Sequence, residues 1–393
     1  MGSNPYTKSP EAALGIKKAV AGDRVLLGLS GGAASAAAAI ILQEQGYSVE
    51  LIHFDFSEKF RAARAEFACL VDRVKDAEKI AQVTGLPLKI VNADGYFQQK
   101  VISPLQENGL QALNFESCSS CHSRFKIEFL YHEAMERKIA HIATGHFVRI
   151  SNESDLGISL WRAKDPIQDQ SFLLSRTRTL LLKSLITPLG HLKIADVERL
   201  LERKELSLPL NRKPELFCNS QKHLSLKYIA ERSAWAVDRE RKGYVLSADQ
   251  RAISEIKAGG VLQYHWGQFE GLEKIREEAT TKGFKSAAKY QVSAIDPIKH
   301  YVYLGPPKHL QRRELVLENV QWIATPDLRR IRELSIVSRG QRIEKVRAEA
   351  LIDNGLHLRL VNDTDVFEIG PGELVALYDK ELCLGSGEVY SGF

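Results

Sequence analysis

The chain has 393 residues, of which 44% are hydrophobic and 26% charged, and its net charge at pH 7 is +5. This length exceeds what one compact core supports, so two or three domains are expected. No apolar stretch approaches the ~20 residues that a membrane-spanning helix needs, so no membrane partner is predicted. The opening residues lack the charged and then apolar segments of a secretory signal, so the cytoplasm is the expected compartment.

The first half of the chain alternates strand-like and helix-like segments. Short apolar runs predict strands at 24–29, 48–54, 88–91 and 139–143. The longer segments between them have helical patterns, at 35–45, 62–84 and 124–137. This alternation is typical of an α/β domain built around a parallel sheet, whose ligands bind beyond the carboxyl ends of the strands.

The first predicted strand ends in the turn Ser30-Gly31-Gly32, which leads directly into a helix. Glycines allow a tight turn that exposes N–H groups, and the start of a helix attracts phosphate. The turn has neither the Walker ending Gly-Lys-Ser/Thr nor the G-x-G-x-x-G dinucleotide fingerprint, and an ordinary β–α connection would look similar. A second turn, Thr144-Gly145-His146, follows a later strand, so both turns are expected to meet at one crevice.

The rest of the chain has a different pattern. Residues 205–284 are mostly helical and polar in pattern, which predicts a small central domain. Beyond residue 290, closely spaced strand candidates predict a small β-barrel, at 290–295, 301–304, 314–317, 334–337, 348–351, 357–360 and 374–378. Asp353-Asn354-Gly355 is a hairpin turn signal between two of them. The predicted domains are therefore 1–204, 205–284 and 285–393.

Basic residues gather in one part of the predicted barrel. Between Lys308 and Arg347 there are ten Lys or Arg against five acids, a surplus of +5 that equals the net charge of the whole chain. Such a basic face suits a phosphate backbone, although solvated arginines on a strand-rich surface give the same pattern. Charge alone does not identify a nucleic-acid partner.

Five cysteines occur, and Cys118 and Cys121 have the C-x-x-C spacing. In a cytoplasmic protein this spacing indicates redox chemistry, a metal site or a nucleophile. Zinc fits the spacing, but no fourth ligand is evident in the sequence, and His122 is too close to Cys121. A cysteine at the start of a helix is more reactive, because its thiolate is stabilised there, which favours a functional role for Cys121. Cys69 and Cys383 are predicted to be buried and inert.

An ordered series of short motifs along nearly the whole chain carries a family resemblance. The motifs are Ser30-Gly31-Gly32 with Ser35, Asp76-Ala77, Cys121 before a basic helix, Ala143-Thr144-Gly145-His146, Asp169-Gln170-Ser171-Phe172, Pro188-Leu189-Gly190, Cys218, Gly267-Gln268, Gly271-Leu272, Pro371-Gly372 and Cys383-Leu384-Gly385. No single motif is decisive, but the ordered series is specific. The sequence resembles the tRNA-specific 2-thiouridylases, PP-loop enzymes that thiolate the wobble uridine of tRNA.

The resemblance implies a PP-loop nucleotide domain, a small central domain and a β-barrel that act with ATP, Mg²⁺, tRNA and a sulfur-donor protein. ATP would adenylate the C2 oxygen of uridine, a persulfide on Cys218 would deliver sulfur, and Cys121 would be the second catalytic thiol. The implied nucleotide contacts are Leu29, Ser30, Gly31, Gly32, Ala33, Ala34, Ser35, Phe54 and Gly145. The implied tRNA contacts are His146, Gln168, Asp169, Gln170, Arg339 and Glu373.

Several positions depart from the family pattern. The family loop reads S-G-G-x-D-S, and Ala34 replaces its acid, which removes a carboxylate that would help to organise Mg²⁺ or the loop. The other altered positions are Gln168 for Lys, Phe269 for Arg, Glu373 for Gln, Glu116-Ser117-Cys118 for the Asn-Pro-x stretch, and Arg339-Gly340 for an Arg-Tyr pair. These changes fall on nucleotide and RNA contacts, whereas both sulfur-handling cysteines remain.

Three functions are open on this sequence. The first is an ATP-dependent tRNA thiolase. The second is a relative that binds tRNA or a sulfur-relay partner without catalysis, which Ala34 and Phe269 favour. In the third, Cys118, Cys121 and Cys218 are the ligands of an iron–sulfur cluster with one open iron site that carries sulfur.

Overall fold

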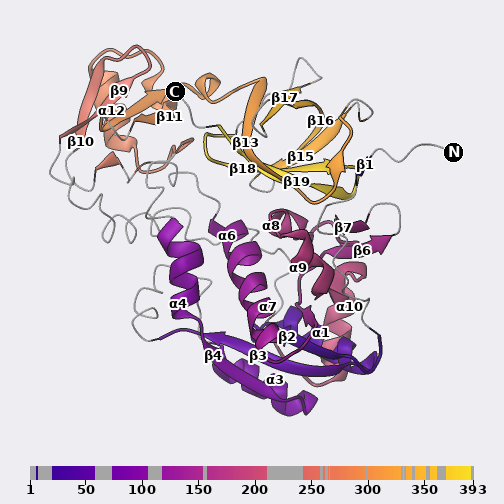
Figure 1. Ribbon diagram of the computed structural model, residues 1–393. Coiled ribbons are helices and arrows are strands. Elements are labelled where there is room, and N and C mark those ends of the chain that lie inside the picture. The colour runs from indigo at the N-terminus through magenta and orange to yellow at the C-terminus, as the bar shows by residue number, and fades with distance from the viewer. Residues whose placement is uncertain are drawn as a thin grey trace.

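A computed structural model describes residues 6–7, 20–57, 73–104, 117–153, 157–209, 242–256, 260–261, 264, 266–296, 299–328, 331, 333–338, 341–350, 355–360 and 369–390. An α/β body lies at the bottom of Figure 1, with a β-barrel above it and a smaller sheet beside the barrel. Among the described residues, no helix is long and apolar enough to cross a membrane.

The α/β body is built on a sheet of five parallel strands in the order β4-β3-β2-β5-β8. These strands are β2 (Arg24–Gly28), β3 (Ser48–Asp55), β4 (Leu88–Asn92), β5 (His141–Ala143) and β8 (Leu185–Ile186). The α/β fold with a parallel sheet that the sequence predicts is confirmed.

Helices cover both faces of this sheet, because side chains alternate between the two faces of a strand. On β2, Val25 and Leu27 belong to the apolar core beneath α1, whereas Leu26 belongs to the core beneath α7. The helices of the body are α1 (Ala33–Glu44), α3 (Val74–Thr84), α4 (Asp94–Phe97), α6 (Ser117–Ser120), α7 (Ile127–Glu136), α8 (Ser171–Leu174), α9 (Thr179–Ser184) and α10 (Ile194–Arg203), with the π-helical turns η4 (Gln98–Ile102) and η6 (Cys121–Lys126) and the 3₁₀ turn η7 (Pro188–His191).

The alanine run in α1 explains how that helix packs. Residues 36–39 are fully buried, and α1 contacts β3, α3, α10 and η7. Small side chains let a helix lie close to its neighbours on every side, and alanine has the best helix propensity. The run is therefore a packing feature that sets the start of α1 firmly at the end of β2.

Cys121 does not start a helix, contrary to the sequence-based expectation. The elements α6, η6 and α7 form one continuous helical segment from Ser117 to Glu136, and Cys121 is the first residue of its π-helical turn. π-helical turns inside α-helices are rare and occur frequently at functional sites. Hence this irregular geometry, rather than a helix start, distinguishes Cys121 in the fold.

The smaller sheet has the strand order β10-β9-β12-β11 and packs against α12 (Glu273–Thr281). Its strands are β9 (Gly243–Ser247), β10 (Ala252–Ile256), β11 (Gln291–Asp296) and β12 (Tyr301–Gly305), and the 3₁₀ turns η11 (Ala287–Lys289) and η12 (Pro307–His309) flank the last two. The prediction that β11 and β12 belong to the barrel is wrong, because β12 pairs in parallel with β9. The mostly helical prediction is also wrong for 243–256, which form the β9–β10 hairpin.

Six antiparallel strands close into the predicted β-barrel in the order β13-β17-β16-β15-β18-β19, and β19 pairs back with β13. They are β13 (Glu314–Trp322), β15 (Leu334–Ser338), β16 (Gln341–Ala350), β17 (Leu356–Leu360), β18 (Leu374–Asp379) and β19 (Leu382–Val389). The strands β6 (Arg149–Glu153) and β7 (Gly157–Trp161) form a hairpin, and β7 pairs with β19 at the edge of the barrel. The short strand β1 (Tyr6–Thr7) pairs with β14 (Thr325–Pro326). The predicted turn at 353–355 lies mostly outside the described residues.

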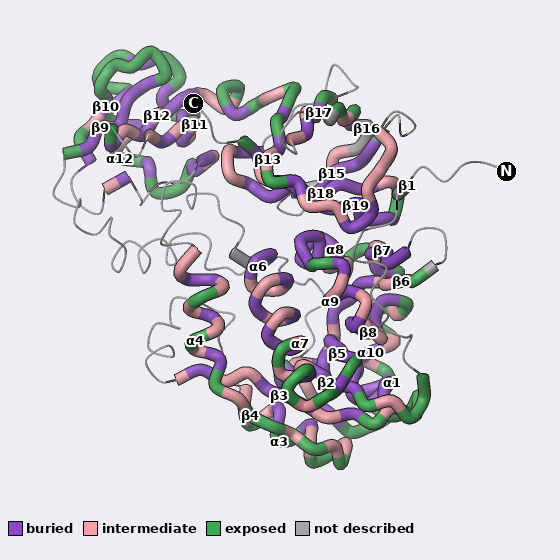
Figure 2. Tube along the Cα trace, in the orientation of Figure 1, coloured by how far each residue is buried: buried purple, intermediate pink, exposed green. Residues whose placement is uncertain are grey.

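One apolar core continues from the α/β body into the barrel. It joins Leu26 and Leu130 of the body to Leu374, Ala376 and Tyr378 of β18. In Figure 2, α8 and the two barrel strands β18 and β19 are coloured as buried. Because burial of apolar surface is the main stabilising term in folding, this shared core holds the two bodies together.

Candidate active site

The turn after β2 folds back on itself through two serine side chains. The hydroxyls of Ser30 and Ser35 lie 3.1 Å apart, and the Ser30 amide donates to the Ser35 hydroxyl at 3.2 Å. The Ser35 hydroxyl donates to the Gly32 carbonyl at 2.9 Å, and the Gly32 amide donates to the Ser30 hydroxyl at 3.3 Å. These bonds hold the loop in one shape without using the first amides of α1.

Two glycines permit the close approach of other backbone segments to this turn. Gly31 has φ +78°, and a Cβ there would lie 2.7 Å from the Cβ of Arg73. A Cβ on Gly145 would lie 2.7 Å from the carbonyl carbon of Ala34 and from the amide nitrogen of Ser35. Consequently the turn after β5 packs directly on the first turn of α1, which brings the two sequence-predicted loops together as expected.

The start of α1 has the electrostatics of an anion site. Gly32 is its N-cap, no side chain caps it, and its first turn contains no acidic residue. Leu29 and Ala33 are buried behind the loop, whereas Ser30 is exposed. The N-terminal amides and the helix dipole both favour negative charge at such a site. Ala34 supplies no carboxylate, so the site has no negative charge of its own there.

Phe54 and Cys121 share one aromatic cluster beside the loop. The Phe54 ring lies 4.8 Å from that of Phe129 and 6.0 Å from that of Phe125, and Cys121 packs against the same cluster. The backbone of the loop is tied to β3, because the imidazole Nδ1 of His53 lies 2.7 Å from the Leu29 carbonyl oxygen. No motif in the sequence points to His53.

His146 lies in a chain of hydrogen bonds beneath the surface. Its Nε2 lies 2.7 Å from the Nδ1 of His122, and its Nδ1 lies 2.8 Å from the Thr144 hydroxyl. The Lys126 ammonium lies 3.2 Å from the Nε2 of His122. Burial, and then the charge of Lys126, lowers the pKa of His146 to about 3. Burial likewise lowers the pKa of His122 well below its usual value, so both rings are neutral at pH 7.

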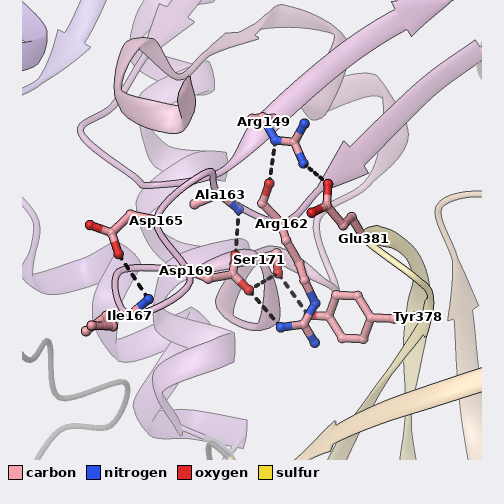
Figure 3. A network of polar contacts seen from close by, with 9 residues as sticks. All are labelled: Arg149, Arg162, Ala163, Asp165, Ile167, Asp169, Ser171, Tyr378 and Glu381. Carbon is pink, nitrogen blue, oxygen red and sulfur yellow. Dashed lines mark hydrogen bonds and ion pairs between the residues drawn. The ribbon is translucent and has the colours of Figure 1, made fainter. Parts of the chain in front are cut away.

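Asp169 is the centre of a network that joins the α/β body to the barrel (Figure 3). Its carboxylate accepts hydrogen bonds from the amides of Ala163 and Ser171, from the Ser171 hydroxyl at 3.0 Å, and from Arg162 at 3.3 Å. The Ser171 hydroxyl also lies 3.0 Å from the Tyr378 hydroxyl of β18, and Arg162 stacks over the Tyr378 ring. Burial raises the pKa of Asp169, whereas the hydrogen bonds from Ala163 and Ser171 and the charge of Arg162 lower it to a smaller extent.

A second bridge runs beside this network. Arg149 of β6 donates to the carbonyl of Arg162 at 2.6 Å and pairs with Glu381 of the barrel at 2.6 Å. Burial raises the pKa of Tyr378 well above its usual value and that of the adjacent Cys383 thiol to about 12. Cys383 is therefore a buried neutral thiol, as the sequence predicts.

The other predicted RNA contacts are largely internal. Gln170 accepts a hydrogen bond from the Phe147 amide at 2.9 Å, and its own backbone amide donates to the Phe147 carbonyl at 3.0 Å. Gln168 is buried, and Glu373 is buried in the barrel, where it accepts from the Gly370 amide and the Ser338 hydroxyl. The segment of Asp169 and Gln170 thus packs against the turn that carries His146, through the bonds of Gln170 to Phe147. Glu373 instead lies in the barrel with Gly370 and Ser338.

Some predicted residues are outside the described part of the chain. Cys218 and Arg339 lie there, and so does the side chain of Cys118. Among the described residues, one group of potential metal ligands is His132, Glu133 and Glu136 on α7, two of which are exposed. This group includes neither cysteine of the C-x-x-C pair, and exposed acidic side chains near a histidine are common without an ion, so it does not indicate a metal centre.

Sequence reasoning missed the partners that hold the site together. Lys126 and Tyr378 received no role, and His122 was considered only as a zinc ligand. His122 and Tyr378 act through neighbours distant in sequence, which a pattern along one chain does not reveal. The one local signal was the basic segment that follows Cys121.

Comparisons with known proteins match both ends of this architecture. The tRNA methyl transferase HUP domain family matches residues 23–218, and the aminomethyltransferase β-barrel domain family matches residues 312–389. Relatives named tRNA-specific 2-thiouridylase MnmA match over most of the chain. The chain belongs to the family of tRNA-specific 2-thiouridylases.

The relatives show how divergent this 2-thiouridylase family member is. The protein from Magnetococcus marinus is 26% identical to this chain, and the match covers 93% of this chain and 98% of that protein. The protein from a Synechococcus strain is 28% identical and covers 93% and 96%, respectively. The protein from Beijerinckia indica is 29% identical over 80% of this chain and 71% of the relative. The resemblance predicted from the ordered motifs is confirmed.

Proposed function

We propose that this protein transfers sulfur, with ATP as co-substrate, to the C2 position of the wobble uridine of tRNA. The observation that carries the proposal is the packing of the Gly145 turn on the uncapped start of α1, next to the aromatic cluster that holds Cys121. An anion site and a thiol on neighbouring elements are what adenylation followed by sulfur attack requires. The names of the relatives support the same reaction.

The first step uses the loop Leu29–Ser35. The uridine C2 oxygen attacks the α-phosphorus of ATP, a new O–P bond forms, and pyrophosphate leaves. The amides at the start of α1 would stabilise the charge that develops on the phosphates, and Phe54 and Gly145 would wall the site. Mg²⁺ would bind the phosphate oxygens, since Ala34 provides no ligand.

The second step uses the two cysteines. A terminal persulfide sulfur on Cys218, supplied by a sulfur-donor protein, attacks C2, and the C2–O bond breaks with AMP as the leaving group. The Cys121 thiolate then attacks the Cys218 sulfur, the persulfide S–S bond breaks, and a Cys121–Cys218 disulfide remains. A dithiol reductant must restore both thiols, which agrees with the reducing cytoplasm as the compartment.

The predicted tRNA-binding residues that the structure describes are mostly buried, so we propose that they shape the RNA surface from below. Gln170 shapes the backbone of Phe147, and Asp169 orders the segment 163–171, whose Ile167 is 65% exposed. We propose that the burial of His146, Gln168 and Glu373 makes them supports of the RNA surface. Arg339, which follows β15 in the sequence, would also contact the RNA.

The test is a single-turnover assay with tRNA, ATP, Mg²⁺ and a persulfide donor, in which 2-thiouridine and pyrophosphate are both measured. Cys121→Ser and Cys218→Ser should abolish 2-thiouridine but keep pyrophosphate release, whereas Cys118→Ser should retain both. Restoring an acid with Ala34→Asp should raise pyrophosphate release. Tight tRNA binding without pyrophosphate would instead establish the non-catalytic relative.

The same samples test the iron–sulfur alternative. After anaerobic purification, loss of iron in all three of Cys118→Ser, Cys121→Ser and Cys218→Ser would replace the disulfide route by the cluster. A Cys121–Cys218 link found by peptide mapping after mild oxidation would support the disulfide route, which requires α-carbons that can approach within about 7 Å.

A further inference from the structure

The hydrogen bonds that join Lys126, His122, His146 and Thr144 have only one possible direction. An ammonium group donates and never accepts, so the Nε2 of His122 must be the acceptor from Lys126. A neutral imidazole has one N–H, which in His122 is then on Nδ1 and donates to the Nε2 of His146 across 2.7 Å. His146 therefore carries its own hydrogen on Nδ1 and donates to the Thr144 hydroxyl across 2.8 Å.

The chain of bonds itself requires neutral rings. A protonated His122 would point an N–H at the Lys126 ammonium, and a protonated His146 would point one at the N–H of His122. In both cases two donors would face each other without an acceptor, which is costly in a buried site. The low pKa values of both histidines agree with this geometry.

The last member of the chain lies at the nucleotide loop. Thr144 follows β5 directly, and its neighbour Gly145 packs on Ala34 and Ser35. The Thr144 hydroxyl oxygen accepts from His146, so its own hydrogen is directed elsewhere. Within the described part of the chain, that hydroxyl makes no other hydrogen bond. A buried hydroxyl of fixed polarity at an anion site is a ready donor for a phosphate oxygen.

We propose that Lys126, His122 and His146 form a one-way hydrogen-bond relay that makes the Thr144 hydroxyl a donor to the phosphates of a nucleotide bound at the loop Leu29–Ser35. The inference rests on the proposed function for the presence of that nucleotide. Thr144 is then a binding residue, and the two histidines and Lys126 are positioning residues. The relay also ties the helical turn of Cys121 to the nucleotide loop, because His122 and Lys126 both belong to η6.

The binding test measures the affinity of the full-length chain for ATP by titration calorimetry. Thr144→Val keeps the shape of the side chain and removes the donor, so ATP should bind about tenfold more weakly, whereas Thr144→Ser should retain the affinity. Lys126→Met removes the ammonium that fixes the direction of the hydrogen bonds, so the Thr144 hydroxyl can then donate to His146 instead of to the nucleotide. ATP should therefore bind about threefold to tenfold more weakly. Lys89→Met, which removes an exposed lysine from β4, is the matched charge control and should change nothing.

A double variant separates the relay from simple attraction between Lys126 and the phosphates. If the relay acts through the hydroxyl, adding Lys126→Met to Thr144→Val should cause no further loss of affinity. Fully additive losses would overturn the relay. Unfolding temperatures of each variant identify a loss that comes from misfolding, and the Thr144→Ser comparison still tests the hydroxyl.

Nitrogen-15 NMR of histidine gives a readout that does not depend on ATP. Both rings should be neutral Nδ1–H tautomers at pH 7, and Lys126→Met should shift the Nε2 resonance of His122. An imidazolium or an Nε2–H tautomer in either ring would overturn the relay. A wild-type chain that keeps these tautomers but binds no ATP would instead contradict the proposed function and, with it, the contact to the nucleotide.

Discussion

Gly145 shows how a single hydrogen in place of a side chain decides whether two loops meet. The Gly145 position has backbone atoms of Ala34 and Ser35 where a Cβ would lie, at distances below those that real contacts adopt. The sequence marks this glycine only as part of a turn. The structure shows that the turn touches the anion site directly, so the effect of a substitution here is expected on binding.

Gly145→Ala should therefore weaken ATP binding at least about tenfold, because the first turn of α1 must shift away from the added methyl group. Gly95→Ala is the control, since a Cβ at Gly95 meets no described atom within 4 Å. Calorimetry measures the affinity, and circular dichroism checks the fold. An ATP affinity equal to that of Gly95→Ala would contradict the close packing of the two turns.

His146 makes stability depend on pH. Its pKa in the folded protein is about 3, below the value of about 6.5 in an unfolded chain, so the unfolded state binds more protons between these values. The contribution of His146 to the free energy of unfolding is fully present above about pH 6.5 and is lost as the pH decreases toward 3. Between pH 7.5 and pH 5 this residue should remove about 2 kcal/mol of unfolding free energy.

Urea unfolding at the two pH values measures this change. The variant His146→Gln has no titrating ring, so its unfolding free energy should fall by less over the same interval. An equal fall in the variant and the wild type would show that His146 does not titrate in this way.

At the scale of elements, the loop between β7 and α8 is held by a strand of the barrel. Ser171 at the start of α8 bonds Asp169 of its own loop and Tyr378 of β18, while Arg162 lies over the Tyr378 ring. Removing one hydroxyl from such a buried network leaves its partner without a hydrogen bond, which is costly. The segment that carries Gln170 thus depends on the barrel for its shape.

Tyr378→Phe removes the phenolic oxygen and keeps the ring beneath Arg162, so stability should fall by about 1–2 kcal/mol. Ser171→Ala should cost a similar amount, and the double variant should cost less than the two together, because the two hydroxyls bond each other. Tyr390→Phe, at an exposed tyrosine, is the control. Additive effects in the thermal unfolding of the variants would show that the two hydroxyls act independently.

At the scale of the whole molecule, the α/β body and the barrel share one core, and Arg312 and Arg313 directly precede β13 of the barrel. In Figure 1 the barrel lies above the α/β body, whereas α3 lies at the bottom of the body. A large polyanion that reaches Cys121 and also contacts the barrel would be attracted by the charges of Arg312 and Arg313.

Reversal of Arg312 and Arg313 to Glu should weaken tRNA binding and reduce the slope of log affinity against log salt, by about 0.7–0.9 for each phosphate that these side chains no longer neutralise. Reversal of Lys89 and Lys138 to Glu, two exposed lysines near the amino ends of β4 and β5, changes the charge by the same amount and should leave the slope unchanged. Filter binding over a range of salt concentrations measures both. Equal slopes in the two double variants would show that the basic segment is only a solvated surface.

Local patterns determined much of this fold. The alternation of apolar runs and helical periods identified the strands β2, β3, β4 and β5, because a parallel sheet buried on both faces needs continuous apolar strands. The glycine turn at 30–32 and the barrel strands followed from signals that lie within a few residues of one another. These features are set by backbone conformation and by side-chain alternation, which the order of residues encodes directly.

Tertiary structure decided which of these elements meet. β12 pairs with β9 rather than with the barrel, His146 reaches His122 across 24 positions, and Ser171 reaches Tyr378 across 207. Such contacts depend on the burial of apolar faces and on the closure of long loops, which no local pattern specifies. The sequence by itself therefore determined the glycine loop and the domain types and predicted the catalytic thiols, whereas only the packed chain fixed the direction of the hydrogen bonds and the partners of the buried polar groups.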